Sequence, residues 1–157
     1  MEGRIRIIMA MEREAQALGI PCETIGIGAG TIPEIAPDDT IINVGYCGGY
    51  KLKPGAVIEP SRSISLETRE TKTMHRHFEG ECESFPCFTS GEFVTAPAYP
   101  WPAVYDMELA KLASVPCRDL VCLKIVSDSL DEGECEAFDD PAAWERVREL
   151  LKGAGLI

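Results

Sequence analysis

The stretch TIINVGYCGG (residues 40–49) joins an apolar run to a glycine-rich turn. Residues 40–45 are almost continuously β-branched or aliphatic, which is typical of a strand that is covered on both faces. The turn leaves the backbone accessible, because few side chains stand between it and a ligand. In an open α/β sheet, ligands bind beyond the carboxyl ends of the strands. The stretch therefore predicts a central strand whose end forms part of a binding site.

Further strands and helices alternate along the chain. Strand patterns also occupy residues 4–10, 55–60, 87–93 and 119–128, of which 87–93 is the weakest. Helical patterns occupy residues 11–18, 103–115 and 140–153, and the last has Asp140 as N-cap, Pro141 at its first position and Gly153 past its end. This alternation predicts an α/β fold, in which a central, mixed but mostly parallel sheet is flanked by helices. With no repeat or linker, residues 1–157 form one predicted domain.

Three acidic residues are candidates for one pocket. Glu108 lies on the predicted helix 103–115, which is apolar nearly all round and therefore predicted to be buried. Glu12 and Asp128 follow or end two predicted strands. A buried carboxylate is costly unless it is hydrogen-bonded or used. Each acid also has a structural explanation: Glu12 as a first-turn acid favoured by the helix dipole, Asp128 as a turn cap, and Glu108 by reaching solvent.

Composition excludes several partners. The net charge of −11, from 26 acids and 15 bases, opposes binding to nucleic acid, which needs a basic face. No apolar run approaches the roughly 20 residues of a membrane span. The N-terminal stretch MEGRIRIIMAMERE lacks a signal-peptide layout, so the expected location is cytoplasmic.

Cysteine and histidine residues give no metal or disulfide pattern. The seven cysteines are odd in number and lack the spacing of a zinc knuckle, so they are predicted to be buried, inert thiols. His75 and His77 have no acid or cysteine at ligand spacing nearby, which favours a solvated loop over a metal site. The sequence thus predicts neither a metal nor a cofactor.

Five motifs, in order, resemble the nucleoside phosphorylase superfamily. They are AMERE (10–14), INVGYCGG (42–49), TSGEF (89–93), YDMELA (105–110) and KIVSD (124–128). The resemblance is closest to the hydrolytic branch, the methylthioadenosine/S-adenosylhomocysteine nucleosidases, whose counterparts read approximately AMEEE, INTGSAGG, VSGD, VEMEA and RAISD. The present chain is a shortened form, because residues 31–40 are too few and too rich in proline and acid for the long helix of that family.

The resemblance implies a role for each matching residue. Asp128 matches the acid that protonates or hydrogen-bonds N7 of the departing purine, and Ser127 helps to set it. Glu108 matches the acid that holds the ribose hydroxyls, with Met107 lining the sugar pocket. Glu12 matches the acid that orients and activates the attacking water. The purine-packing segment falls at Phe93 or Val94, and the Gly-rich turn contributes Gly45 and Tyr46.

The resemblance implies a purine nucleosidase that acts on a small-molecule nucleoside, with 5′-substituted adenosines among the expected substrates. It also implies a homo-oligomer, with a dimer as the first expectation. Phosphorylases of the superfamily hold phosphate with Arg and Ser or Thr near the Gly-rich turn, whereas this chain has Asn43 and Tyr46 there, which favours water as the nucleophile. A phosphate-dependent phosphorylase, a non-catalytic nucleoside-binding protein and, last, a metal-dependent enzyme are the alternatives.

Overall fold

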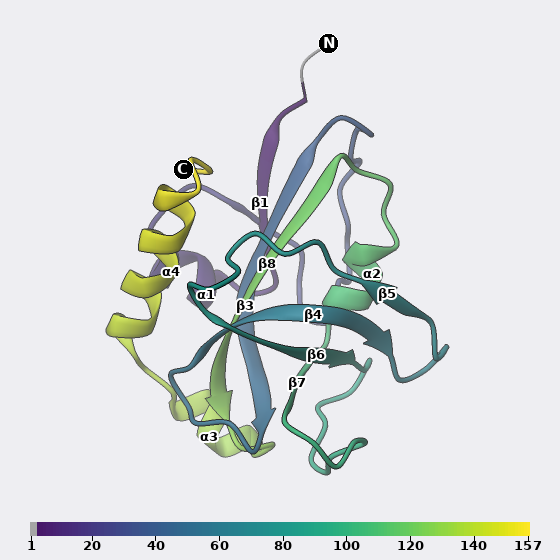
Figure 1. Cartoon of the computed structure of the whole chain (residues 1–157), viewed down its shortest axis with the longest axis vertical. Helices are drawn as coiled ribbons and strands as arrows, with labels where there is room; N and C mark the ends of the chain where they lie inside the picture. The colour runs from purple at the N-terminus through teal and green to yellow at the C-terminus, as the bar shows by residue number, and fades with distance from the viewer. Residues whose placement is uncertain (1–2) are drawn as a thin grey trace.

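The structure, a computed structural model, describes residues 3–157 and is built around an eight-stranded sheet (Figure 1). The strands are β1 (Ile5–Met9), β2 (Glu23–Thr24), β3 (Thr40–Tyr50), β4 (Val57–Ser65), β5 (Thr71–Thr73), β6 (Glu83–Thr89), β7 (Ala103–Asp106) and β8 (Asp119–Asp128). The helices are α1 (Glu12–Leu18), α2 (Leu109–Ala113), α3 (Glu132–Ala137) and α4 (Pro141–Gly153). Among these helices only α1 and α4 are substantial.

Five of the strands close into a barrel. The sheet runs β2-β1-β3-β7-β6-β4-β5, and β8 pairs with both β3 and β4, so that β3, β7, β6, β4 and β8 form a ring. Five strand pairings are parallel and three are antiparallel. The prediction of a mixed, mostly parallel sheet is therefore confirmed, but the sheet is a barrel rather than open. The long β3–β8 pairing contains a bulge at Cys47/Gly48, a feature that increases local twist.

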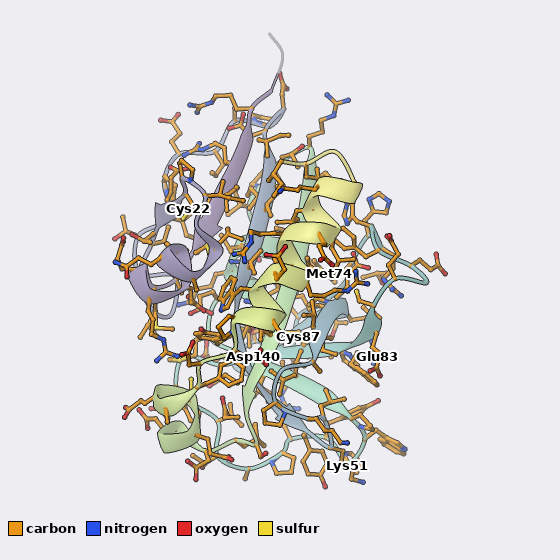
Figure 2. All side chains as sticks on the ribbon, turned by 90° about the vertical axis from the view of Figure 1, so that its left-hand side faces the viewer. Cys22, Lys51, Met74, Glu83, Cys87 and Asp140 are labelled. Atoms are coloured by element: carbon orange, nitrogen blue, oxygen red, sulfur yellow. The ribbon has the colours of Figure 1, made fainter. Side chains whose placement is uncertain are left out.

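Helix α4 covers the outer face of β3 and β8. Its buried residues Trp144, Val147, Leu150 and Leu151 pack in one cluster with alternate residues of these two strands. Asp140 caps the helix by accepting a hydrogen bond from the backbone N–H of Ala143 at 3.2 Å, as predicted. Figure 2 shows Asp140 at the start of α4, with the helix lying across the sheet. The helix includes Gly153, which the sequence had placed just beyond its end.

The barrel interior is filled by alternate residues of all five strands. One buried cluster contains Cys47, Ile58, Cys87, Val104 and Cys122, together with Val126. Burial raises the pKa of the thiols of Cys47, Cys87 and Cys122, and the last reaches about 12. These three cysteines are thus buried and protonated, as predicted. The other four are only partly buried.

Two sequence predictions about secondary structure are wrong. Residues 103–115 do not form one helix: residues 103–106 are β7, which pairs with β3 and β6, and only Leu109–Ala113 are helical. A strand in the wall of a barrel is buried on both faces, so its apolar run imitates a buried helix. In residues 87–93 the strand ends at Thr89. The segment 61–86, which has no clear pattern, supplies parts of β4 and β6 and all of β5.

Most of the other predicted elements are confirmed: β1, β8 and α1 form where the sequence indicates, and β4 is shifted to Val57–Ser65. The glycine-rich turn predicted at residues 45–49 is wrong, because β3 continues through these residues to Tyr50 and pairs there with β7 and β8. Residues 31–39 contain no helix, as their prolines and acids predict. No helix within residues 3–157 is both long and apolar enough to cross a membrane.

A buried ion pair lies inside the barrel. Lys124 on β8 alternates with Cys122 and Val126, so its side chain faces inward, and its Nζ lies 3.0 Å from Asp106 Oδ2. The side chains are 1% and 0% exposed, respectively. Burial opposes the charged form of Lys124, but the nearby carboxylates of Asp106 and Glu108 raise its pKa, so the lysine stays a cation. Asp106 also accepts from the Thr89 hydroxyl at 2.5 Å and the Leu109 N–H at 2.8 Å.

Removing one partner of this pair is expected to destabilise the fold strongly. Lys124→Met leaves the Asp106 carboxylate buried without its cation, which costs about 3–5 kcal/mol. The double variant Lys124→Met/Asp106→Asn removes both charges while keeping an oxygen acceptor, and should recover most of that loss. Urea unfolding of wild type, Lys124→Met and the double variant measures this recovery, and equal stabilities of the single and double variants would contradict it.

Candidate functional site

A cleft of about 480 Å³ opens at the carboxyl ends of β3 and β8. This volume is typical of small-molecule sites. Its walls come from the start of α1, the ends of β3, β7 and β8, and α3. The lining residues are Met11, Arg13, Glu14, Ile27, Tyr46, Cys47, Gly48, Phe93, Val94, Tyr105, Asp106, Met107, Glu108, Ser127, Asp128, Glu132, Cys135 and Glu136. Both bulge residues of β3 are among them.

Most residues that the sequence singled out line this cleft. They are Asp128, Glu108, Met107, Phe93, Val94, Ser127 and Tyr46. Gly45 and Glu12 are not part of the lining. The structure thus brings together predicted residues from four separate segments of the chain, and two of the three predicted acids are among them.

Glu12 does not face the cleft, and Glu14 does. Glu12 is exposed on the first turn of α1, whereas Glu14 is buried. Two residues along a helix correspond to a rotation of about 200°, so the two side chains point in nearly opposite directions. The acid that faces the cleft has a signal in the sequence: Glu14 stands three residues after the N-cap Met11, at the position of a capping-box glutamate.

The Glu14 carboxylate is held by two backbone amides. It accepts from Met11 N–H at 2.9 Å and from Tyr46 N–H at 2.6 Å. Burial raises the pKa of Glu14, while these hydrogen bonds and the charge of Lys124 act in the opposite direction. The carboxylate therefore has a fixed position against the backbone of β3 at Tyr46, and it is easier to protonate than an ordinary glutamate.

Gly45 does not line the cleft, but it lies next to the Glu14 carboxylate. A Cβ at this position would lie 2.9 Å from Glu14 Oε2 and 3.6 Å from Lys124 Nζ. Only glycine leaves room for both groups, since the carboxylate is fixed by its two hydrogen bonds. The family resemblance implies a place for Gly45 in the site, and what this glycine does there is to permit the close approach of Glu14 and Lys124.

Glu108 is the acid with the weakest hydrogen bonds. It stands at the N-cap of α2 and accepts from Gly28 N–H at 3.5 Å and from Met107 N–H at 3.2 Å. Burial raises its pKa to about 7, Lys124 opposes this shift, and Asp106 and Glu14 add to it. Its lone pairs are not fully used by the protein, which suits a group that binds a hydroxyl.

Asp128 is held by three donors at the end of β8. Its Oδ2 accepts from the Ser127 hydroxyl at 2.8 Å, and its Oδ1 accepts from Leu130 N–H at 2.9 Å and Asp131 N–H at 3.2 Å. Burial nevertheless raises the pKa of Asp128. A Cβ on Gly48 would lie 3.1 Å from Asp128 Oδ1, so this glycine also makes room for an acid of the site.

Arg13 and Tyr46 form one wall of the cleft. The Arg13 guanidinium lies 4.8 Å from the centre of the Tyr46 ring and donates to the Cys135 and Glu136 carbonyls at 2.9 and 3.0 Å. The Tyr46 hydroxyl accepts from Trp144 Nε1 at 3.1 Å. This wall thus links α1, α3 and α4. Arg13, like Asp106 and Lys124, had no signal in the sequence that separated it from other charged residues.

Solved structures share this fold. The structure of the methylthioadenosine nucleosidase MTAN of Chlamydia trachomatis bound to MTA aligns with a TM-score of 0.73 at 14% identity, covering 99% of this chain and 100% of that one. The 5′-methylthioadenosine nucleosidase of Arabidopsis thaliana gives 0.67 at 14% identity, over 98% and 96% of the two chains. Futalosine hydrolase of Helicobacter pylori gives 0.69 at 13% identity, over 96% and 98%.

The fold is therefore the one shared by these nucleosidase and hydrolase structures, matched over nearly the full length of the chain. No protein-family model and no curated protein matches the chain. The resemblance drawn from five short motifs is confirmed at the level of the fold.

Glu108→Gln is expected to stabilise the protein at neutral and higher pH. Folding raises the pKa of Glu108 from 4.5 to about 7. Between these two pH values the folded state therefore binds more protons than the unfolded state. The free energy of unfolding of wild type consequently falls as the pH rises from 4.5 to 7. Glutamine has no such cost. The stability difference in favour of the variant should grow from pH 4.5 to 7 by at most about 3 kcal/mol.

Urea unfolding at several pH values measures this difference. The matched control is Glu132→Gln, because Glu132 also lines the cleft but is exposed. A difference between Glu108→Gln and wild type that does not change with pH would contradict the raised pKa.

Gly45→Ala is expected to cost about 1–3 kcal/mol of stability, because the new methyl group displaces the fixed Glu14 carboxylate. Gly153→Ala is the control, since no atom lies within 4 Å of a Cβ there. Thermal unfolding of both variants is the measurement. Equal, unchanged stability in both would show that Glu14 moves freely.

Proposed function

We propose that the chain is a nucleosidase that hydrolyses the N-glycosidic bond of purine nucleosides. The observation that carries this proposal is the meeting of Glu14, Glu108 and Asp128, from α1, the start of α2 and β8, in one cleft. Burial raises the pKa of all three. A structural explanation that suits one buried acid does not account for three in the same cleft, because each carries its own desolvation cost.

Asp128 is the proposed general acid. Its raised pKa favours a protonated carboxyl, and a purine leaves poorly as an anion unless a proton reaches it. As the bond between C1′ and the base nitrogen breaks, the electron pair goes to the base and the Asp128 proton goes to N7. The Ser127 hydroxyl and two backbone amides keep the carboxyl in one orientation during this transfer.

Glu14 is the proposed base for water, the role that the sequence assigned to Glu12. The water oxygen forms the new bond to C1′, and its proton passes to the Glu14 carboxylate. The two backbone amides that donate to Glu14 hold its carboxylate in one orientation. Positive charge that develops on the sugar is stabilised by the carboxylates around it. Divided roles among acids are the usual solution for glycoside cleavage.

Glu108 and Met107 are proposed to bind the ribose, and Phe93 and Val94 the purine. The long hydrogen bonds of Glu108 leave acceptor capacity for sugar hydroxyls. Ile27 and Tyr105 add apolar surface to the cleft. Such a lining suits a 5′-substituted adenosine such as methylthioadenosine or S-adenosylhomocysteine, which is the substrate class we propose.

Water is favoured over phosphate as the nucleophile. Among the described residues that line the cleft, Arg13 is the one cation, and its guanidinium already donates to two carbonyls of α3. Asn43 is buried in β3 and donates to the Ile8 carbonyl at 2.9 Å, away from the cleft lining. A phosphate dianion would therefore meet three carboxylates with little cationic compensation.

The test is base release measured by chromatography. The protein is incubated with methylthioadenosine, S-adenosylhomocysteine, adenosine and inosine, each with and without phosphate. We expect phosphate-independent release, reduced about 100-fold or more in Asp128→Asn and in Glu14→Gln. Glu12→Gln is the matched control for Glu14→Gln and should stay within about twofold of wild type, because its side chain is outside the cleft.

The other outcomes are equally informative. Release that requires phosphate would make the protein a phosphorylase. A thermal shift with these nucleosides but no turnover would make it a nucleoside-binding protein. Loss of activity in Glu12→Gln with activity retained in Glu14→Gln would reverse the assignment of the base.

A further inference from the structure

A second cluster of functional side chains lies far from the cleft. His75 and His77 are on the connection between β5 and β6, and Asp119 is the first residue of β8. Asp128, in the cleft, is the last residue of the same strand, so the two sites are separated by the strand's length of about 30 Å. The cluster therefore has no part in the cleft chemistry.

We propose that His75, His77 and Asp119 bind a divalent transition-metal ion of the zinc type. One ligand atom from each residue lies within 4.8 Å of the others. Imidazole nitrogen with one carboxylate oxygen is a donor set that suits zinc and its neighbours rather than calcium or magnesium. Three protein ligands leave one coordination position for water.

Both histidine rings already have a nitrogen close to the Asp119 carboxylate. His75 Nδ1 lies 3.3 Å from Asp119 Oδ1. Bonds of 2.0–2.1 Å to a tetrahedral ion place its ligands about 3.4 Å apart. His77 Nε2 lies 2.7 Å from Asp119 Oδ2, a hydrogen bond that an ion would replace by a small rotation of the carboxylate. His75 is 73% exposed, so an ion reaches the cluster from solvent without unfolding.

The second nitrogen of His77 strengthens the inference. When Nε2 donates to Asp119, a neutral His77 has no proton on Nδ1, which is buried without a hydrogen-bond partner among the described residues. Nδ1 lies 3.5 Å from Glu59 Oε2. A metal on Nε2 would shift the proton to Nδ1, where it faces this carboxylate. The result is the carboxylate–histidine–metal arrangement that commonly orients metal ligands.

Glu59 is rigid enough for this supporting role. It is buried and accepts from Arg76 Nε at 2.6 Å, from His77 N–H at 2.7 Å and from Phe78 N–H at 3.1 Å. Phe78 is itself fully buried in the core. A metal here would tie the β5–β6 connection to the start of β8. We therefore expect it to stabilise the fold.

The test is zinc binding by the full chain after treatment with a chelator and dialysis. Titration calorimetry with ZnCl₂ should give one ion per chain, and saturating zinc should raise the Tm by about 5 °C. His75→Ala and Asp119→Asn should each weaken binding at least tenfold and abolish the Tm shift. His75→Ala is the cleaner variant, since its exposed ring supports little of the fold.

Two controls separate this site from other binding. Asp139→Asn removes an exposed acid elsewhere and should leave zinc binding unchanged. Cobalt(II) substitution should give visible ligand-field bands without thiolate charge transfer, because the proposed ligands are nitrogen and oxygen. Three results would each overturn the proposal: zinc binding that survives His75→Ala and Asp119→Asn, a thiolate charge-transfer band, or the absence of stoichiometric binding. The cluster would then be a hydrogen-bonded connection between the β5–β6 segment and β8, without a metal.

Discussion

The buried pair of Lys124 and Asp106 is the interaction on which the candidate site depends. Lys124 places one cation inside the barrel, next to the end where Glu14, Glu108 and Asp106 gather. Without it, those carboxylates would face one another in a medium that screens charge poorly. Asp106 in turn accepts from Leu109 N–H and so fixes the start of α2, where Glu108 stands. The pair therefore sets both the charge and the geometry of the cleft.

The three acids of the cleft differ in how completely the protein satisfies them. Asp128 has three donors, and Glu14 has hydrogen bonds of 2.6 and 2.9 Å from two backbone amides. Glu108 has two long ones and a pKa of about 7. A group that must keep one orientation while a proton moves needs fixed donors, whereas a group that binds substrate hydroxyls needs unused acceptors. These differences are the physical reason for dividing the proposed roles as we do.

The sequence predicted the elements whose signals are local and missed those that depend on barrel closure. The apolar runs of β3 and β8 and the caps of α4 are visible along the chain. Residues 103–106 form a barrel strand that is buried on both faces, so their continuous apolar pattern is the same as that of a buried helix. The motif AMERE contains two acids, and only the rotation of α1 distinguishes Glu14 from Glu12. Asp119 joins His77 across 42 residues, a separation that no ligand-spacing rule covers.

β8 connects these features because a pleated strand holds its residues at fixed spacing and on fixed faces. Leu123 and Ile125 pack toward α4, while Cys122, Lys124 and Val126 point into the barrel. Its first residue joins the histidine cluster, and its last enters the cleft. Residues 121–128 are all buried, and all of them except Ser127 at the bulge are paired with β3, so neither end shifts without breaking ladder hydrogen bonds. A metal at Asp119 would thus act on the stability of this strand, and the position of Asp128 would follow from the β3–β8 register rather than from the metal.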